Sequence, residues 1–334
     1  MLNKKTTMRA LVLKEFGDEL VLSHIDQPIA GEGQVLVKIM ASGVNPLDTK
    51  IRSGQAAHAR PQLPAVLGID IAGVVVEVGN NVTGFKSGDE VYGMTGGVGG
   101  LQGSLAEYAA VDASLLAIKP RNFTMREAAA VPLIFITAWE GLVDRAGLKY
   151  GDKVLVQGGA GGVGQMAVQI SLAFGAEVFA TEALKRKTAV EGLGATFIDY
   201  ETINAEDYVQ QYTNGEGFDI VYDTAGGSTL DLSFKSVKSY SGHVVSCLGW
   251  GTHPLAPLSF RAATYSGVFT LLPMLTGKGR VHHGEIMREA TRLIEAGKVQ
   301  VLLDPTLYTL ENAIEAHRAI ENRTAKGKLV VEIQ

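Results

Sequence analysis

A glycine-rich turn has the spacing G-x-G-x-x-G, and it contains Gly159, Gly161, Gly162, Val163 and Gly164. Glycines in this pattern permit a tight turn and let a pyrophosphate approach the backbone, while the N-terminus of a following helix offers N–H groups to it. Because the chain has 40 glycines, the pattern alone is weak, and the alternative is a purely structural turn. An apolar strand at 154–156 precedes it and an apolar helix follows. The turn is therefore predicted to bind a dinucleotide.

Charged residues follow the next expected strand, where the ribose of a dinucleotide would lie. Glu182 ends that strand, and a carboxylate there binds the ribose hydroxyls of NAD but repels the 2′-phosphate of NADP. Lys185, Arg186 and Lys187 follow at once and would attract that phosphate, especially if Glu182 turns toward Lys185. The alternative for the three cations is a solvated helix face. These residues leave the choice between NAD and NADP open.

Alternating strands and helices must position this turn, and the middle of the chain supplies them. Strands are expected at 152–157, 177–181, 196–199, 218–223, 243–248 and 265–271, with helices at 163–174 and 185–193. Such alternation indicates a doubly wound parallel sheet with helices on both faces.

The first third and the tail contain short strands bounded by glycine or proline. Strands are predicted at 9–13, 34–40, 72–78, 88–93, 299–303 and 328–333, with a helix at 310–321. Apolar residues at three- and four-residue steps predict a buried helix over 128–148. The fold class is therefore α/β, with a mostly-β domain at 1–128 and 276–334 and a Rossmann domain at 129–275.

Composition excludes several functions. Hydrophobic residues make up 46% and charged residues 19%, and the net charge is −5, so the basic surplus of a nucleic-acid binder is missing. Neither a signal peptide nor a membrane helix is expected. The single cysteine, Cys247, excludes an intramolecular disulfide and is expected to be a small buried residue. These features favour a cytoplasmic enzyme that binds neither nucleic acid nor membrane.

Several sequence blocks, spread over nearly the whole chain, have a specific order and spacing. They are Gly43–Gly54, Leu67–Asp70, Gly88–Gly93, Gly103–Tyr108, Ile136–Trp139, the glycine-rich turn and Gly327–Val331. In these blocks the chain resembles the zinc-free quinone oxidoreductases of the medium-chain dehydrogenase/reductase superfamily. The resemblance implies a GroES-like catalytic domain, a Rossmann domain and an active site in the cleft between them.

The residues at the superfamily's zinc positions predict that this chain binds no catalytic zinc. In its zinc alcohol dehydrogenases the first ligand is a cysteine where Asn45 stands, and the second is a histidine, followed by a glutamate, where Ile69 and Asp70 stand. An amide and an isoleucine cannot replace a thiolate and an imidazole as zinc ligands. The adjacent His282 and His283 are expected to be exposed rather than a metal pair.

Three residues near the first zinc position are candidates for catalysis. The resemblance places Asn45 at the cleft, where its amide would donate to a substrate carbonyl or to the nicotinamide ribose; a turn-stabilising side chain is the alternative. Asp48 and Arg52 share a face if this stretch is helical, so they serve catalysis or form a structural ion pair. The proton donor stays open between His58 and water.

The resemblance also implies contacts with the cofactor. Thr137 matches a threonine near the nicotinamide, although a hydroxyl bonded back into its own helix is the alternative. Tyr200 stands where NADPH-using relatives have a tyrosine. The remaining predicted contacts are Leu248, Gly249 and Phe269, near carboxyl ends of parallel strands, and Lys328. Three more aromatic residues line a flat pocket or belong to the core, namely Trp250, Phe260 and Tyr265.

Together these features predict zinc-independent hydride transfer from NADPH to a quinone or an α,β-unsaturated carbonyl, with NADH as the alternative cofactor because of Glu182. Alcohol oxidation is less favoured, because it would lack the Lewis acid that stabilises an alkoxide. A second alternative is a crystallin-like protein that binds the cofactor without turnover. The resemblance further implies a homodimer.

Overall fold

The computed structural model describes residues 6–333. The chain divides into a first unit, Met1–Leu133 with Leu271–Gln334, and a second unit, Ile134–Thr270. The junctions lie a few residues from the expected ranges 1–128 with 276–334 and 129–275, whose assignment as domains stays a prediction. Within the described residues, no helix combines the length and the apolar character needed to cross a membrane.

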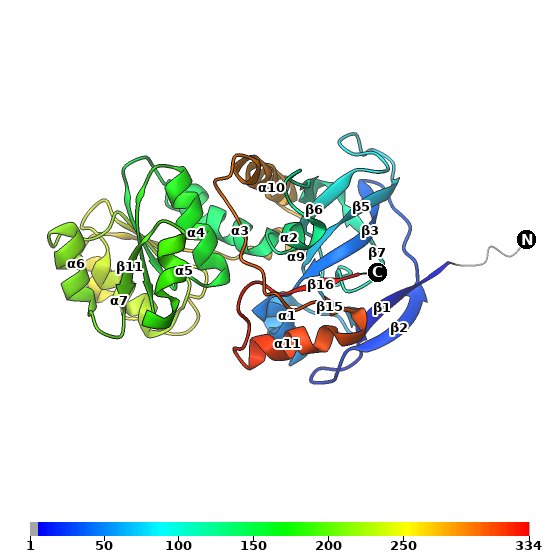
Figure 1. Cartoon of the computed structure of the whole chain (residues 1–334), viewed down its shortest axis with the longest axis horizontal. Helices are drawn as coiled ribbons and strands as arrows, with labels where there is room; N and C mark the ends of the chain where they lie inside the picture. Colours follow the sequence, from blue (N-terminus) through cyan, green and yellow to red (C-terminus); the bar gives the residue numbers. More distant parts are fainter. Residues whose placement is uncertain (1–5, 334) are drawn as a thin grey trace, which may run out of the picture. The chain divides into compact units, whose positions relative to one another are not determined.

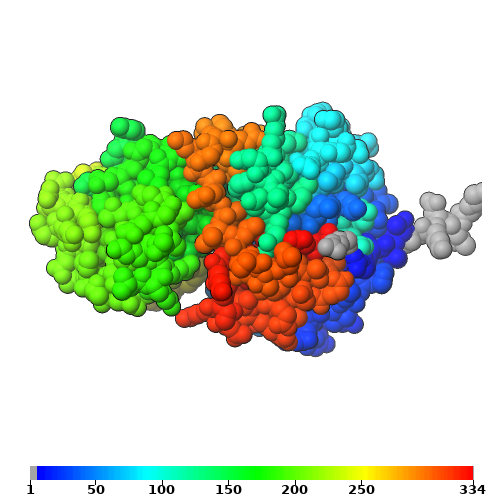
Figure 2. Space-filling model, in the orientation of Figure 1, coloured from blue at the N-terminus to red at the C-terminus, as the bar shows by residue number. Residues whose placement is uncertain are grey.

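A strand near the N-terminus, β3 (Gln34–Gly43), is central to the main sheet of the first unit. It pairs antiparallel with β5 (Asp70–Val78), β7 (Tyr108–Asp112) and β16 (Val330–Glu332). Because β16 comes from the end of the chain, the tail completes a sheet that the N-terminal residues begin. Figure 2 shows orange and red C-terminal residues against blue N-terminal ones.

The remaining strands of the first unit extend this sheet or form a small one beside it. The main sheet continues through β6 (Glu90–Met94), β8 (Leu116–Ile118) and β15 (Tyr308–Thr309). The three-stranded sheet consists of β2 (Val21–Asp26), β1 (Thr7–Leu13) and β4 (Ala65–Val66). This mostly-β unit agrees with the expected GroES-like domain.

Helices cover the first unit's sheets. They are α1 (Pro46–Arg52), α2 (Met125–Ala129), α9 (Leu272–Thr276), α10 (Arg280–Glu295) and α11 (Ala313–Glu321). Proline suits the first position of α1 because an N–H there would have no partner in the helix. The sequence did not predict α10, although its buried residues recur at helical steps at 283, 286, 287, 290, 293 and 294.

The second unit contains a six-stranded parallel sheet in the order β11-β10-β9-β12-β13-β14. The strands are β9 (Lys153–Gln157), β10 (Glu177–Glu182), β11 (Thr196–Asp199), β12 (Ile220–Asp223), β13 (His243–Ser246) and β14 (Thr264–Gly267). Counted along the chain, this order is 3-2-1-4-5-6, which is typical of dinucleotide-binding Rossmann domains. The predicted fold class is confirmed.

Helices cover both faces of this sheet (Figure 1). On one face lie α4 (Gly162–Ala173) and α5 (Lys187–Gly192), which connect β9 to β10 and β10 to β11. The other face carries α6 (Ala205–Thr213) and α7 (Ser228–Ser236), with the short α8 (Ala256–Ser259) packed against α7. Between sheet and helices lies a core of buried aliphatic and aromatic side chains that includes Phe179, Phe218 and Phe234.

Three predicted segments were wrong in extent or type. The single helix at 128–148 is replaced by α2, α3 (Pro132–Trp139) and a π-helix at Glu140–Arg145, because Pro132 lacks the N–H that would continue α2. Residues 299–303 form no strand and contribute one isolated bridge, from Leu303 to Lys328. The last strand of the parallel sheet ends at Gly267, and the chain soon enters α9.

Candidate active site

The glycine-rich turn joins β9 to α4 in the second unit. A Cβ at Gly159 would lie 2.4 Å from the Ala180 side chain, and one at Gly164 would lie 2.1 Å from the Gly158 oxygen. Neither position has room for a side chain. Since α4 begins at Gly162, its first N–H groups point out of the helix without intrahelical partners. They can bind an anion, and the helix dipole favours one.

Two residues that the sequence analysis did not single out hold this turn. The carbonyl of Thr181 accepts from the N–H groups of Gly158 and Gly159 at 3.1 and 3.2 Å. The Thr181 hydroxyl donates to the Gln157 side chain at 2.6 Å. Both side chains are buried. A polar residue at or next to the end of a buried strand is the sequence signal that could have identified Gln157 and Thr181.

Glu182 faces the turn rather than open solvent. It is 9% exposed, and its Oε1 accepts from the Ala160 N–H at 3.3 Å. Arg186 donates to the Ala160 carbonyl at 2.7 Å, and its Nη1 lies 3.7 Å from Glu182 Oε1. Of the cations that follow β10, Arg186 rather than Lys185 reaches both the carboxylate and the turn.

The other predicted cofactor residues of the second unit lie in two groups. Lys185 and Tyr200 are exposed and come just after β10 and β11. Leu248 and Gly249 follow the end of β13, at the carboxyl edge of the sheet. That edge is where open α/β sheets bind their ligands. The cofactor roles of these residues stay predictions.

Thr137, Phe269 and Tyr265 pack against neighbouring residues, whereas the side chains of two other aromatic candidates are exposed. Thr137 is buried, and its carbonyl accepts from the Tyr222 hydroxyl at 2.6 Å. Phe269 packs edge-on against Trp250, and Tyr265 packs edge-on against Phe234 of the core. Trp250 and Phe260 are exposed at 53% and 87%. Tyr265 therefore belongs to the core, whereas Trp250 and Phe260 do not.

A buried polar cluster occupies the first unit, and its members are Asn45, Asp48, Asp70 and Lys328. Three neighbouring strands bring them together, because Gly43 of β3 pairs with both Asp70 of β5 and Val330 of β16. Asn45 follows the end of β3, and Lys328 precedes β16. The exposed fractions are 0% for Asn45, 1% for Asp48, 0% for Asp70 and 8% for Lys328.

The Asn45 amide is held on both sides within this cluster. Its nitrogen donates to Asp70 Oδ2 at 2.9 Å, and its oxygen accepts from the Lys328 ammonium. The Lys328 Nζ lies 3.7 Å from Asp70 Oδ2. Asp48 accepts from the Asn45 backbone N–H at 2.8 Å, and Asp70 Oδ1 accepts from the Leu133 N–H at 2.9 Å. Direct donation by Asn45 to a substrate stays a prediction.

Burial dominates the electrostatics of the cluster. Loss of water raises the pKa of Asp48 to about 7 and raises the pKa of Asp70. Burial lowers the pKa of Lys328, and the attraction of Asp70 and then Asp48 opposes that shift. Groups with such shifts are frequent at functional sites, because the protonation state can then change near neutral pH.

The predicted ion pair between Asp48 and Arg52 was wrong. The stretch is helical, but Arg52 Nη2 binds Glu321 of α11 at 2.6 Å. The carboxylate of Asp48 instead points to the start of its own helix, at the Asn45 N–H. Arg52 thus ties α1 to α11 rather than to the buried cluster.

Two family models match this chain. One, described as an alcohol dehydrogenase GroES-like domain, matches residues 31–121. The other, described as a zinc-binding dehydrogenase, matches residues 193–331. A solved structure of an alcohol dehydrogenase superfamily protein from Novosphingobium aromaticivorans is similar, with 54% identity and a TM-score of 0.96. The alignment covers 98% of this chain and 100% of that one.

Curated relatives match over nearly the whole chain. A 2-methylene-furan-3-one reductase of Solanum lycopersicum is 38% identical, and a chloroplastic NADPH-dependent alkenal/one oxidoreductase of Arabidopsis thaliana is 37% identical. Each alignment covers 97% of this chain and 79% of the relative. A quinone oxidoreductase of Homo sapiens is 31% identical, with 97% of both chains covered.

The chain belongs to the quinone oxidoreductase-like family of the medium-chain dehydrogenase/reductase superfamily. It is therefore an oxidoreductase that transfers hydride with a nicotinamide cofactor, in agreement with the strand order and the glycine-rich turn.

The zinc that one family model's description implies does not fit the residues of this quinone oxidoreductase-like chain. At the zinc positions, Asn45 offers an amide that Asp70 and Lys328 already engage, and Ile69 has no donor atom. An ammonium next to Asp70 also repels a cation from that carboxylate. Among residues 6–333 no three histidine, cysteine, aspartate or glutamate side chains form a group that could hold a metal.

The structure also shows the surroundings of His283 and Cys247, for which the sequence predicts an exposed histidine and a buried thiol. His283 is buried at 0% exposure, so the expectation of two exposed histidines was wrong for it, because it lies on the inner face of α10. Cys247 lies just after β13 and is half-buried. Burial raises the pKa of its thiol to about 12, which disfavours a nucleophilic thiolate at neutral pH.

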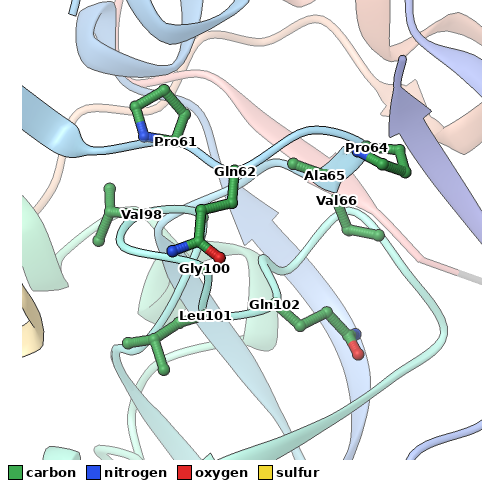
Figure 3. A pocket seen from close by; sticks show the side chains of 10 residues that line it. Pro61, Gln62, Pro64, Ala65, Val66, Val98, Gly100, Leu101 and Gln102 are labelled. Atoms are coloured by element: carbon green, nitrogen blue, oxygen red, sulfur yellow. The ribbon is translucent and has the colours of Figure 1, made fainter. Parts of the chain in front are cut away.

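A pocket of about 190 Å³ lies in the first unit (Figure 3). Its lining includes Gln62 and Pro64 on one side and, on the other, Gly97, Gly100 and Gln102 of a glycine-rich loop at 96–103. The Gln102 side chain donates to the Tyr108 carbonyl at 2.7 Å. Strand β7 rather than a helix follows this loop.

Proposed function

We propose that this protein uses NADPH to reduce an α,β-unsaturated carbonyl compound or a quinone, without a metal ion. The observation that carries the proposal is the glycine-rich turn in a 3-2-1-4-5-6 parallel sheet, in a chain whose relatives are named alkenal/one oxidoreductase and quinone oxidoreductase. When bound, the reduced nicotinamide supplies the hydride. The chain's residues supply binding, orientation and electrostatics.

The turn and the strand ends are proposed to bind the cofactor. The N–H groups at the start of α4 would bind the pyrophosphate, at a turn that closes tightly because Gly159 and Gly164 have no Cβ to clash with Ala180 and Gly158. Backbone groups at Leu248 and Gly249 would border the nicotinamide. Thr137 and Phe269 are buried or packed against neighbours, so their contribution is to shape this edge.

Two arguments support NADPH over NADH. The carboxylate that would repel a 2′-phosphate is occupied by the Ala160 N–H and neutralised by Arg186. Lys185 and Tyr200 are exposed next to it and can contact a phosphate. The name of the Arabidopsis thaliana relative points the same way.

The donor set at the zinc positions supports reduction without zinc. An alkene conjugated to a carbonyl accepts hydride without a Lewis acid more readily than a simple ketone does, because the resulting enolate shares its negative charge between oxygen and carbon, whereas a ketone gives a localised alkoxide. The cluster of the first unit offers charged and polar groups for that site, with Asn45 and Asp48 as the proposed catalytic residues.

The protein is further proposed to be a cytoplasmic homodimer. Among the described residues, no strand pairs with the outer edge of β14, and such an edge is a template for a second strand. Two copies related by a twofold axis can pair their β14 edges symmetrically. Phe260, which precedes β14 in the chain, is exposed and offers apolar area for such an interface. Sedimentation equilibrium should give twice the chain mass, and a single-chain mass would reject the dimer.

Steady-state oxidation of NADPH tests the function, with matched panels of enones, quinones and simple aldehydes. The proposal expects saturable turnover with enones or quinones and little with aldehydes. Tight NADPH binding without turnover on any acceptor would instead support a crystallin-like binding protein. The ratio of NADPH to NADH affinity tests the cofactor preference.

A further inference from the structure

A lysine ammonium lies where burial is costly. Lys328 is 8% exposed, and an unpaired ammonium in such a place would lose its hydration without compensation. Its Nζ contacts the Asn45 oxygen and lies 3.7 Å from Asp70 Oδ2. These two partners account for its position. Asn45 stands at the first zinc-ligand position of the zinc-dependent members of the superfamily, and Asp70 directly follows the second, which is Ile69 here.

The buried carboxylate of Asp70 calls for a cation beside it. Asp70 is fully buried, and Asp48 is 1% exposed, so two carboxylates share a region that excludes water. Within the described residues, the cluster's cation is Lys328. A buried carboxylate that loses its cation is destabilised by several kcal/mol, whereas the neutral pair is tolerated.

We propose that the Lys328 ammonium is the fixed cation of this active site, occupying between Asp70 and Asn45 the place that the metal takes in zinc-dependent relatives. Lys328 is then a positioning residue. It fixes the flip of the Asn45 amide, with the oxygen toward Lys328 and the nitrogen toward Asp70, so that the polar groups of the cluster are ordered before a substrate arrives.

This inference deepens the proposed function, because it names what replaces the metal at that site. It also changes the role that the sequence suggested for Lys328. The ammonium turns to Asn45 and Asp70 in the first unit, so contact with the cofactor is not needed to explain its burial.

A double-mutant cycle on stability tests the inference without any turnover. The variants are Lys328→Met, Asp70→Asn and the pair together, with exposed Lys326→Met as the matched control. Lys328→Met should lower the thermal unfolding midpoint by roughly 5–10 °C, because it leaves Asp70 without its cation. Adding Asp70→Asn should recover at least half of that loss. If the double variant loses as much in unfolding midpoint as the two single variants together, the proposal is overturned.

Chemical rescue tests whether the charge itself acts on the reaction. Lys328→Ala should lose kcat, and methylammonium or ethylammonium should restore both kcat and the unfolding midpoint in a saturable manner. Lys328→Met fills the space and should not respond, and tetramethylammonium, which has no N–H donor, should restore neither value. If Lys328→Met keeps wild-type kcat and stability, the proposal is wrong. If Lys328→Ala does not fold, the stability cycle decides.

A metal graft distinguishes this inference from the proposed function. Asn45→Cys with Ile69→His restores the zinc-type donors, and cobalt(II) absorption reports binding. Cobalt affinity should rise at least tenfold when Lys328→Met is added, because the competing ammonium is gone. Equal affinities with and without Lys328 would overturn the inference, whatever the enzyme reduces. Conversely, a chain inactive on every enone and quinone would refute the function and leave the stability cycle intact.

Discussion

Replacing Gly164 by alanine should damage the dinucleotide turn without touching any charged group. The new Cβ would lie 2.1 Å from the Gly158 oxygen, 2.9 Å from the Gly158 carbonyl carbon and 3.0 Å from Gly159 Cα. All three are backbone atoms, which cannot move aside as a flexible side chain can. Since a carbon–oxygen contact needs about 3.3 Å, the turn must shift by about 1 Å.

The shift has two measurable costs. Overpacking of this kind destabilises by about 1–3 kcal/mol. A displacement of about 1 Å also misaligns the N–H groups at the start of α4. Misplacements of this size can cost an enzyme about 10²-fold in reaction rate. We therefore expect the NADPH dissociation constant of Gly164→Ala to rise at least tenfold, together with a lower unfolding midpoint.

Isothermal titration with NADPH and thermal unfolding measure the two effects, with Gly192→Ala as the control. A Cβ at Gly192, at the end of α5, would meet no atom within 4 Å. That variant should bind NADPH normally and gain up to about 1 kcal/mol, because alanine favours helix over glycine. If Gly164→Ala binds and unfolds like Gly192→Ala, the steric argument for the turn is wrong.

Three further predictions concern charge. Arg186→Ala should weaken NADPH binding about tenfold and NADH binding less, because it frees the Glu182 carboxylate to repel the 2′-phosphate. An equal loss of affinity for NADPH and NADH would contradict this prediction. Glu182→Ala should tighten NADPH relative to NADH in the same titrations, and the cofactor proposal fails if wild type prefers NADH and the substitution weakens it. Burial, aided by Arg52, lowers the pKa of His317 to about 4 from 6.5. Between pH 6.5 and pH 4 the unfolded state binds a proton that the folded state does not. The contribution of His317 to the free energy of unfolding is therefore fully present above pH 6.5 and falls by up to about 3 kcal/mol toward pH 4. In urea unfolding measured at several pH values, His317→Leu should flatten this pH dependence, and an unchanged pH dependence would contradict the prediction.

The alternation of strands and helices and the glycine-rich turn were predictable because they depend on local signals. Apolar strands that alternate with helices, with glycine where a side chain cannot fit, indicate a Rossmann unit, whereas the order of the strands within the sheet is a tertiary property that the sequence did not predict. The helix α10 carried an equally regular pattern at 283, 287, 290 and 294. Its apolar residues are separated by many charged ones, so its apolar signal is weaker than that of the buried helices of the second unit.

The partners of charged side chains were not predictable, because they come from distant parts of the chain. Asp48 and Arg52 have the spacing of an ion pair, but α11 brings Glu321 to Arg52. Glu182 meets Arg186 rather than Lys185, since the helical turn sets which cation reaches back to Ala160. Lys328 meets Asn45 only because β16 pairs with β3. Spacing suggests such contacts, and the tertiary fold selects among them.

The fate of the hydride in metal-depleted enzyme tests the central claim most directly. The protein is dialysed against a strong chelator, its zinc content is measured, and an enone is reduced with NADPH that carries deuterium at both C4 positions. We predict unchanged kcat and product that carries one deuterium at the β-carbon by mass spectrometry. Activity lost on chelation and restored by zinc, or product without deuterium, would contradict it.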